Sequence, residues 1–128
     1  DDNQCCYCQT QEANSGISLS CEHILPKSKG GENTFENVCL ACRSCNEFKP
    51  SAIEGIDSIT GQKHALLNPR SQHWINHFQW SEDGTKIEGL TPTGRATVVQ
   101  LRMNRTAIVA ARRRWVASGW HPPSGQAQ

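Results

Sequence analysis

Two short apolar runs interrupt the polar and turn-rich stretches of the first fifty residues. Residues 16–21 and 37–41 each have the length and alternation of a β-strand. The stretch between them is rich in Pro, Gly and Asn, which is typical of a loop. The pattern therefore predicts a hairpin with a long loop, followed by a short helix over residues 43–49 that ends before Pro50.

The pattern after residue 50 predicts a loop, a second hairpin and two helices. Glycine and proline are closely spaced in residues 51–73, so we expect an ordered loop there. Apolar residues in 74–80 and 86–90 flank a Ser-Glu-Asp-Gly turn, as in a β-hairpin. A Thr-Pro start predicts a helix over 92–103, and Asn104 is expected to cap a helix that ends at Gly119.

The composition indicates that the hydrophobic core needs a supplement. The chain has 128 residues, which suits one α+β folding unit: a core of residues 1–50 with an extension, residues 51–128, packed on it. Only 23 residues are Val, Ile, Leu or Phe. The formal net charge is +1, but residues 1–64 carry −4 and residues 65–128 carry +5. A polyanion site should therefore depend on the second half, and no apolar run is long enough to span a membrane.

Cysteine spacing predicts what supplements the core. Seven cysteines, an odd count, include two Cys-x-x-Cys pairs, and no signal peptide is evident, which favours a reducing, cytoplasmic setting over disulfides. Four thiolates at this spacing suit a structural Zn²⁺, whereas buried free thiols are the alternative. The predicted ligands are Cys5, Cys8, Cys42 and Cys45. The other three, Cys6, Cys21 and Cys39, are expected to be small buried residues, with Cys21 and Cys39 facing each other across the hairpin.

Polar residues inside the zinc frame suggest hydrolytic chemistry. Glu22 and His23 end the first predicted strand, Asn37 opens the second, and Asn46 follows the last zinc ligand directly. Carboxylate and amide oxygens are hard ligands that suit Mg²⁺ or Mn²⁺. An adjacent imidazole suits a general base that activates water. This set of groups predicts metal-assisted phosphodiester hydrolysis.

The same stretch resembles the HNH endonuclease family and its ββα-metal fold. The resemblance rests on Glu22-His-Ile-Leu-Pro26, Gly30-Gly31, Asn37, the Cys42–Cys45 pair followed by Asn46, and Lys49. Glu22 stands where Asp is usual in the family, and Asn46 where His is more common. The later residues look like the extension of many small bacterial HNH proteins.

The resemblance implies a role for each of these side chains. It makes His23 the general base, with Asn37 bracing the hairpin loop and orienting His23. It makes Glu22 and Asn46 the ligands of the catalytic Mg²⁺ or Mn²⁺. The implied activity is a DNA endonuclease that cuts one strand per active site and leaves a 5′-phosphate and a 3′-hydroxyl. RNA is not excluded as a second substrate, and neither is a role for the protein in a larger nucleic-acid-processing system.

Basic side chains supply the expected contacts to DNA phosphates. In the last helix, an arc of apolar residues should pack on the domain, with the Arg112 stem buried beside it and its guanidinium paired with a carboxylate or carbonyl. Seven other residues are predicted to bind nucleic acid: Lys27, Lys29, Arg43, Lys49, Arg102 on the preceding helix, Arg113 and Arg114. Solvated surface charge is the plainer alternative for them. The rival function for the whole chain is a non-catalytic zinc ribbon that binds nucleic acid or protein.

Overall fold

The first part of the chain forms a β-hairpin followed by a helix. The computed structural model describes residues 3–123. A short helix α1 (Glu12–Ser15) leads to β1 (Ser20–His23), which pairs antiparallel with β2 (Val38–Ala41), and α2 (Arg43–Phe48) follows directly. Two 3₁₀ turns, Lys27–Lys29 and Phe35–Asn37, lie in the long connection between the strands. The expected hairpin, loop and short helix are therefore all present.

The first strand begins later than the sequence predicts. Gly16 adopts a left-handed φ of +71° and ends α1, so the strand starts at Ser20 and continues to His23. The pairing register then places Cys21 opposite Leu40 and Cys39 opposite Glu22. Because neighbouring residues of a strand point to opposite faces, Cys39 is buried whereas Cys21 is exposed. The expectation that the two cysteines face each other in the interior is wrong.

Residues 51–73 contain a small sheet where a loop was expected. Strands β3 (Glu54–Ile56) and β4 (Lys63–Ala65) pair antiparallel across the outside of a C-terminal helix. Gly55 lies so close to this helix that an added Cβ would stand 2.6 Å from the carbonyl oxygen of Ala96. Beside it, Arg95 Nε lies 2.6 Å from Asp57 Oδ1 and holds the pKa of that carboxyl well below its usual range. These two strands are therefore stabilised by contacts with residues that are distant in the sequence.

The second hairpin and the two C-terminal helices are present as predicted, with local changes. Residues of α3 (Trp74–His77) form one helical turn rather than strand, before β5 (Phe78–Trp80) pairs with β6 (Ile87–Gly89). Helix α4 (Pro92–Gln100) is capped by the Thr91 side chain, which accepts a hydrogen bond from Gly94 N. Helix α5 (Thr106–Ala117) has no side-chain cap, because Asn104 binds the backbone N–H and carbonyl of Ile87 instead.

Arg112 is buried as the helical arc predicts. Its side chain is fully enclosed, and its Nη1 donates to the carbonyl oxygen of Thr85 at 3.0 Å, with Asn104 Oδ1 at 3.3 Å. Its guanidinium also lies 5.2 Å from the ring centroid of Trp80. The expected carbonyl partner is confirmed, and Arg112 joins α5 to the β5–β6 hairpin.

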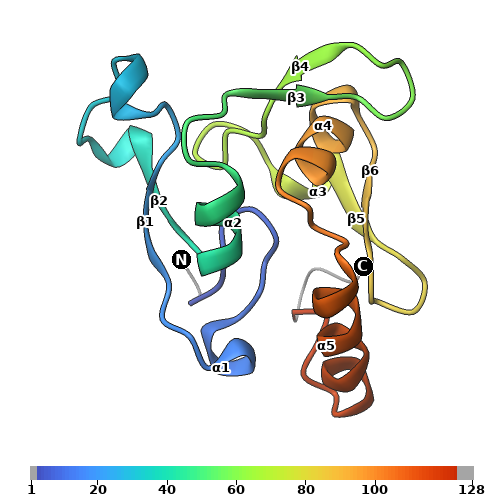
Figure 1. The fold of residues 1–128 in the computed structure, drawn as a ribbon. Coiled ribbons are helices and arrows are strands. Elements are labelled where there is room, and N and C mark those ends of the chain that lie inside the picture. Colours follow the sequence, from blue (N-terminus) through green and yellow to red (C-terminus); the bar gives the residue numbers. More distant parts are fainter. Residues whose placement is uncertain (1–2, 124–128) are drawn as a thin grey trace.

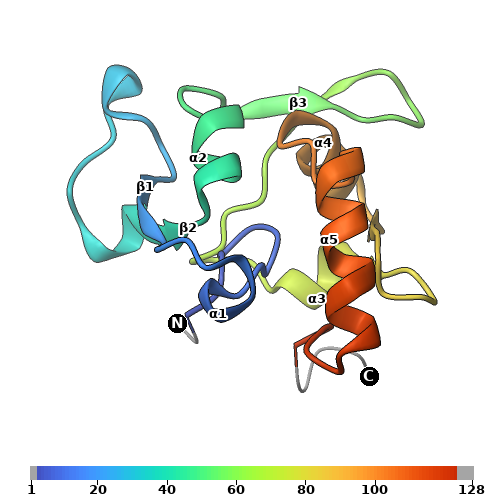
Figure 2. The ribbon, with the colours of Figure 1, turned by 60° about the horizontal axis from the view of Figure 1, so that its bottom comes forward.

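One buried cluster includes residues from both halves of the chain. Cysteines of the first fifty residues pack with apolar residues of the later elements; the cluster contains Cys5, Tyr7, Cys8, Cys39, Ala41, Cys45, Leu66, Leu67, Phe78, Ile87, Leu101 and Met103. In Figures 1 and 2, α2 lies between the β1–β2 hairpin and the C-terminal helices. The longest helix within residues 3–123 has 12 residues, and none there could cross a bilayer.

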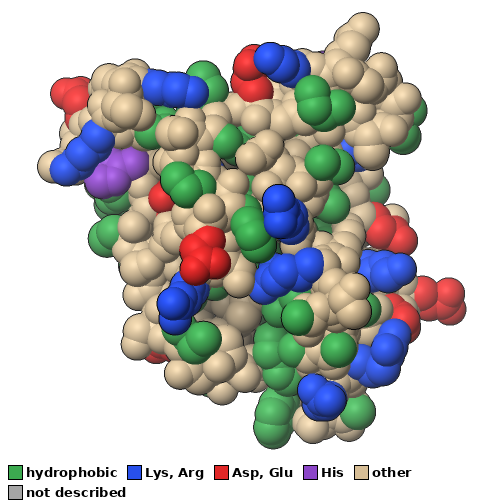
Figure 3. All heavy atoms as spheres, viewed as in Figure 1, with side chains coloured by type: hydrophobic (Ala, Val, Ile, Leu, Met, Phe, Trp, Pro, Cys, Tyr) green, Lys and Arg blue, Asp and Glu red, His purple; other side chains and the backbone are tan. Residues whose placement is uncertain are grey.

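One face of the molecule combines a histidine with many cationic side chains. In Figure 3 the histidine lies over the loop that joins β1 and β2. Lys and Arg side chains lie beside it, between α2 and the turn that joins α4 to α5, and along α5. The basic second half of the sequence therefore contributes to the same face as the hairpin.

Candidate active site and zinc centre

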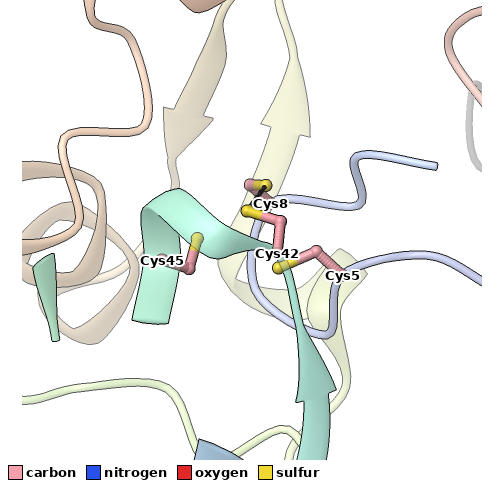
Figure 4. Close-up of side chains that lie close together, drawn as sticks. All are labelled: Cys5, Cys8, Cys42 and Cys45. Carbon is pink, nitrogen blue, oxygen red and sulfur yellow. Dashed lines mark hydrogen bonds between the residues drawn. The ribbon is translucent and has the colours of Figure 1, made fainter. Parts of the chain in front are cut away.

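Four thiols meet where α2 begins (Figure 4). The Sγ atoms of Cys5, Cys8, Cys42 and Cys45 all lie within 4.8 Å of one another, and those of Cys8 and Cys42 are 3.6 Å apart. Four sulfurs on one zinc ion, at Zn–S distances of about 2.3 Å, would be separated by about 3.8 Å. The donor set and its spacing therefore fit a tetrahedral structural zinc ion.

Local backbone structure presents these thiols from two places. A tight turn brings Cys5 and Cys8 together: Gln9 N donates to Cys5 O, Cys5 N donates to Thr10 O, and Tyr7 N donates to Cys5 Sγ at 3.4 Å. Cys42 is the N-cap residue of α2 and Cys45 lies in its first turn. Burial opposes ionisation of Cys5, but hydrogen bonds with Cys42 and Cys45 hold its pKa well below the usual value. A hydrogen bond with Cys45 also lowers the pKa of Cys42, whereas hydrogen bonds with Cys42 raise the pKa of Cys8 and of Cys45. Thiolate, the form that binds metal, is therefore favoured at Cys5 and Cys42.

A buried ion pair joins β1 to the end of α2. Lys49 is only 2% exposed, and its Nζ lies 2.9 Å from Glu22 Oε2. The same ammonium donates to the carbonyl oxygens of His23 at 3.0 Å and Ile24 at 2.9 Å. The expectation that Lys49 binds a DNA phosphate is therefore wrong, because its three donors are already used in the interior. Lys49 instead fixes the strand end that carries Glu22 and His23.

Asn46 contacts the same strand one helical turn before Lys49. Its Nδ2 donates to Ser20 Oγ at 2.5 Å, while Lys49 reaches Glu22 two residues farther along β1. Ser20 and Glu22 share one face of the strand, because side chains alternate. Glu22 and Asn46 consequently lie on the same side of β1, facing α2, and offer one carboxylate and one amide oxygen. This donor set fits a hard divalent cation.

Asn37 braces the loop between the strands. Its Oδ1 accepts a hydrogen bond from Leu25 N at 2.8 Å, and its Nδ2 donates to Leu25 O at 3.0 Å and to Glu32 O at 2.9 Å. The backbone adds a further bond from Ile24 N to Asn37 O. These contacts fasten both ends of the loop directly beside His23. The side chain of Asn37 therefore acts on the loop backbone rather than on the imidazole.

The residue that contacts the His23 imidazole is Asn33, which the sequence reasoning missed. His23 Nε2 lies 2.6 Å from Asn33 Oδ1. Because an amide oxygen only accepts hydrogen bonds, Nε2 is the donor in this contact, and in the neutral imidazole Nδ1 keeps its lone pair. The only available signal was a polar residue two positions after the Gly30-Gly31 pair. Its distance to His23 depends on how the loop folds back.

The remaining basic residues lie at the surface. Lys27 and Lys29 are exposed in the first 3₁₀ turn of the loop. Arg43 is exposed on α2, with its Nε 3.7 Å from Glu47 Oε1. Arg113 and Arg114 are exposed on α5. Arg102 is exposed as well, but it lies in the turn after α4 with a φ of +49°, rather than on the helix as expected.

The hairpin followed by a helix and the four clustered thiols define the class of protein: a small mixed α/β protein whose cysteine cluster is compatible with a zinc knuckle. Residues 5–55 match the family described as HNH endonuclease, so the resemblance noted from the sequence is confirmed over this segment. All four thiols lie within the matched residues, as do Glu22, His23, Asn33, Asn37 and Asn46. No curated protein and no solved structure is detectably similar to the chain.

Replacing Lys49 with methionine should destabilise the fold strongly. The substitution would leave the Glu22 carboxylate nearly buried without its partner, which costs about 3–5 kcal/mol in free energy of unfolding. Urea denaturation followed by circular dichroism measures this. Lys63→Met, at an exposed lysine of β4, is the matched control. A double variant, Glu22→Leu with Lys49→Met, should recover part of the loss, whereas a Lys49→Met protein as stable as its parent would contradict the buried pair.

Proposed function

We propose that the protein is a metal-dependent DNA endonuclease that hydrolyses phosphodiester bonds, one strand at each active centre. The observation that carries the proposal is that β1, inside the HNH-matched segment, ends in a carboxylate paired with Lys49 at the end of α2 and, at the next residue, an imidazole, with the amide of Asn46 on the neighbouring helix. These groups are the Glu22 carboxylate, the Asn46 amide and the His23 imidazole held by Asn33. They combine hard metal ligands with a base of suitable chemistry.

Glu22 and Asn46 are the proposed ligands of the catalytic Mg²⁺ or Mn²⁺. Lys49 occupies Glu22 Oε2, and Ser20 accepts from Asn46 Nδ2, so the proposed donors are Glu22 Oε1 and Asn46 Oδ1. When bound, the cation supplies electrostatic stabilisation of the scissile phosphate and of the leaving 3′ oxygen. The buried Lys49 ammonium holds the carboxylate in place.

His23 is the proposed general base. Its Nδ1 takes the proton of the attacking water, and the Asn33 amide oxygen then stabilises the imidazolium through its bond to Nε2–H. The backbone of His23 is held on one side by Lys49 and on the other by the Asn37-braced loop. The ring therefore needs little reorganisation as the proton moves. Because the 3′ oxygen is the leaving group, cleavage leaves a 5′-phosphate and a 3′-hydroxyl.

A non-catalytic zinc ribbon is the less favoured alternative. Such a module needs the four thiolates, and the zinc ion would serve folding in both cases. A binding module has no use, however, for a carboxylate held by a buried lysine beside an oriented imidazole. The proposed function uses all of these groups, and for this reason we prefer it.

Incubation with supercoiled plasmid tests the proposal. With Mg²⁺ or Mn²⁺ we expect nicked circles to accumulate before linear DNA, because one active centre cuts one strand. Brief EDTA treatment should abolish cleavage while the circular dichroism spectrum stays unchanged, since a buried thiolate site exchanges zinc more slowly than an oxygen-ligand site exchanges Mg²⁺. His23→Ala protein purified in parallel controls for contaminating nucleases. DNA binding without cleavage under any divalent cation would instead support the zinc-ribbon alternative.

A further inference from the structure

Two arginines lie over one aromatic ring beside α2. The guanidinium carbon of Arg102 is 4.9 Å from the ring centroid of Phe48, and that of Arg105 is 5.7 Å from it. Both distances lie within the range of cation–π attraction. We call Phe48, Arg102 and Arg105 the Phe48 platform. It joins the end of α2 to the turn between α4 and α5.

Hydrogen bonds hold one of the two guanidinium groups in position. Arg105 Nη2 donates to Ser44 Oγ at 2.8 Å, and Arg105 Nη1 donates to Arg102 O at 3.3 Å. Arg102 is exposed and has a left-handed φ of +49°, a conformation that an arginine rarely adopts. The turn therefore brings a second cation next to the first instead of separating them. A guanidinium group held in position, as that of Arg105 is, loses little side-chain freedom when it binds an anion.

No carboxylate neutralises this charge within residues 3–123. Neither Arg102 nor Arg105 has an acidic partner there, in contrast to Arg43 with Glu47 and Arg95 with Asp57. Burial lowers the pKa of Arg112, and the charge of Arg105 lowers it further. Like charges placed close together are unfavourable unless an anion lies between them. The platform therefore carries positive charge that a bound phosphate would neutralise.

The platform and the proposed active centre flank the same short helix. Asn46 of α2 contacts β1, and Phe48 of α2 faces the α4–α5 turn. A helix with its side chains is about 10–12 Å across. Because one DNA strand advances about 3.4 Å per phosphate, this width corresponds to about three nucleotide steps. Figure 3 shows cationic side chains between α2 and this turn on the face that also carries the histidine over the β1–β2 loop.

We propose that Arg102 and Arg105, presented over Phe48, bind backbone phosphates of duplex DNA about three nucleotide steps from the bond to be cut. This inference rests on the proposed function and assigns the path of its substrate. Contacts to phosphate alone carry no sequence information, so the platform should position any duplex. The path runs from the β1–β2 loop, across the exposed side of α2, to the start of α5.

Arg113 and Arg114, which are exposed on α5, are weaker candidates for binding the DNA phosphates. Arg113 borders a hollow that Glu82 and Asp83 also line. The side-chain and backbone donors of Thr85 lower the pKa of Asp83 to about 2, with a smaller contribution from the charge of Arg113. Arg113 therefore has an acidic neighbour that Arg102 and Arg105 lack. The pair Arg113 and Arg114 therefore serves as the comparison for the pair Arg102 and Arg105 in the same chain.

Salt-dependent binding tests the assignment. The affinity of a short fluorescent duplex is measured by anisotropy over a series of KCl concentrations, in a His23→Ala background so that the DNA stays intact. Arg102→Gln with Arg105→Gln should flatten the plot of log affinity against log salt by about 1.8, or about 0.9 for each phosphate that the variant no longer binds. Lys63→Gln with Lys86→Gln, which removes the same net charge elsewhere, should leave the slope unchanged. Arg102→Gln alone should lower it by about 0.9 and disturbs no side-chain hydrogen bond.

The outcomes separate this inference from the proposed function. An unchanged slope in Arg102→Gln, with the parent protein binding DNA normally, overturns the platform and leaves the endonuclease proposal intact. An equal or larger loss in Arg113→Gln with Arg114→Gln moves the phosphate contacts to the outer end of α5 and also overturns it. If the parent binds no duplex at all, both proposals fail. Thermal melting and zinc content of each variant verify folding, and the single Arg102 variant decides the question if Arg105→Gln unfolds.

Discussion

The Cys45→Ser protein is expected to lose zinc and most of its tertiary structure. Cys45 is 2% exposed and its Sγ lies among three other thiols in the first turn of α2. A structural zinc site supplies about 10–16 kcal/mol of folding free energy, which is as large as the net stability of a typical domain. Removing one ligand therefore should leave too little stability, because only 23 residues are Val, Ile, Leu or Phe.

The measurement compares zinc content and the near-ultraviolet circular dichroism of purified variants. Cys21→Ser is the matched control, since Cys21 is exposed and lies outside the thiol cluster. It should keep one zinc ion per chain and melt as the parent does. A Cys45→Ser protein that retained both zinc and a cooperative melting transition would exclude Cys45 as a ligand.

The second large effect is expected at His23. His23→Ala should reduce single-turnover cleavage by ~10²- to 10⁴-fold, the usual contribution of a general base. Its affinity for uncut DNA should change little, because phosphate contacts carry most of the binding free energy. Single-turnover cleavage and equilibrium binding are therefore measured on the same protein. Undiminished cleavage would remove His23 from the mechanism.

Variants of Asn33 test how the imidazole is held. Asn33→Ala removes the acceptor 2.6 Å from His23 Nε2, whereas Asn33→Asp keeps an oxygen there. Cleavage should fall in Asn33→Ala and be largely restored in Asn33→Asp. The nitrogen chemical shifts of His23 report the tautomer directly and need no activity. If these shifts were the same in the parent and in Asn33→Ala, Asn33 would not determine the proton's position.

The spacing of residues along the chain was enough to predict several features of this protein from the sequence alone. Each Cys-x-x-Cys pair brings its two thiols together through a turn or the start of a helix, so the four clustered thiols, the candidate zinc ligands, could be named without a structure. Thr91 and Pro92 mark the start of α4 for a similar reason, because capping involves residues three positions apart. The Glu22-His23, Asn37 and Asn46 pattern also indicated the family, which the match over residues 5–55 supports.

Only the tertiary structure decided which polar groups are available for chemistry. Lys49 looked like a phosphate contact, but an ion pair with a residue 27 positions earlier buries it. Strands β3 and β4 form against α4, and Asn33 reaches His23 through a folded loop. The Phe48 platform joins residues more than fifty positions apart in the same way. Periodicity and spacing report contacts within a few residues, whereas burial and ion pairing depend on segments that only the folded chain brings together.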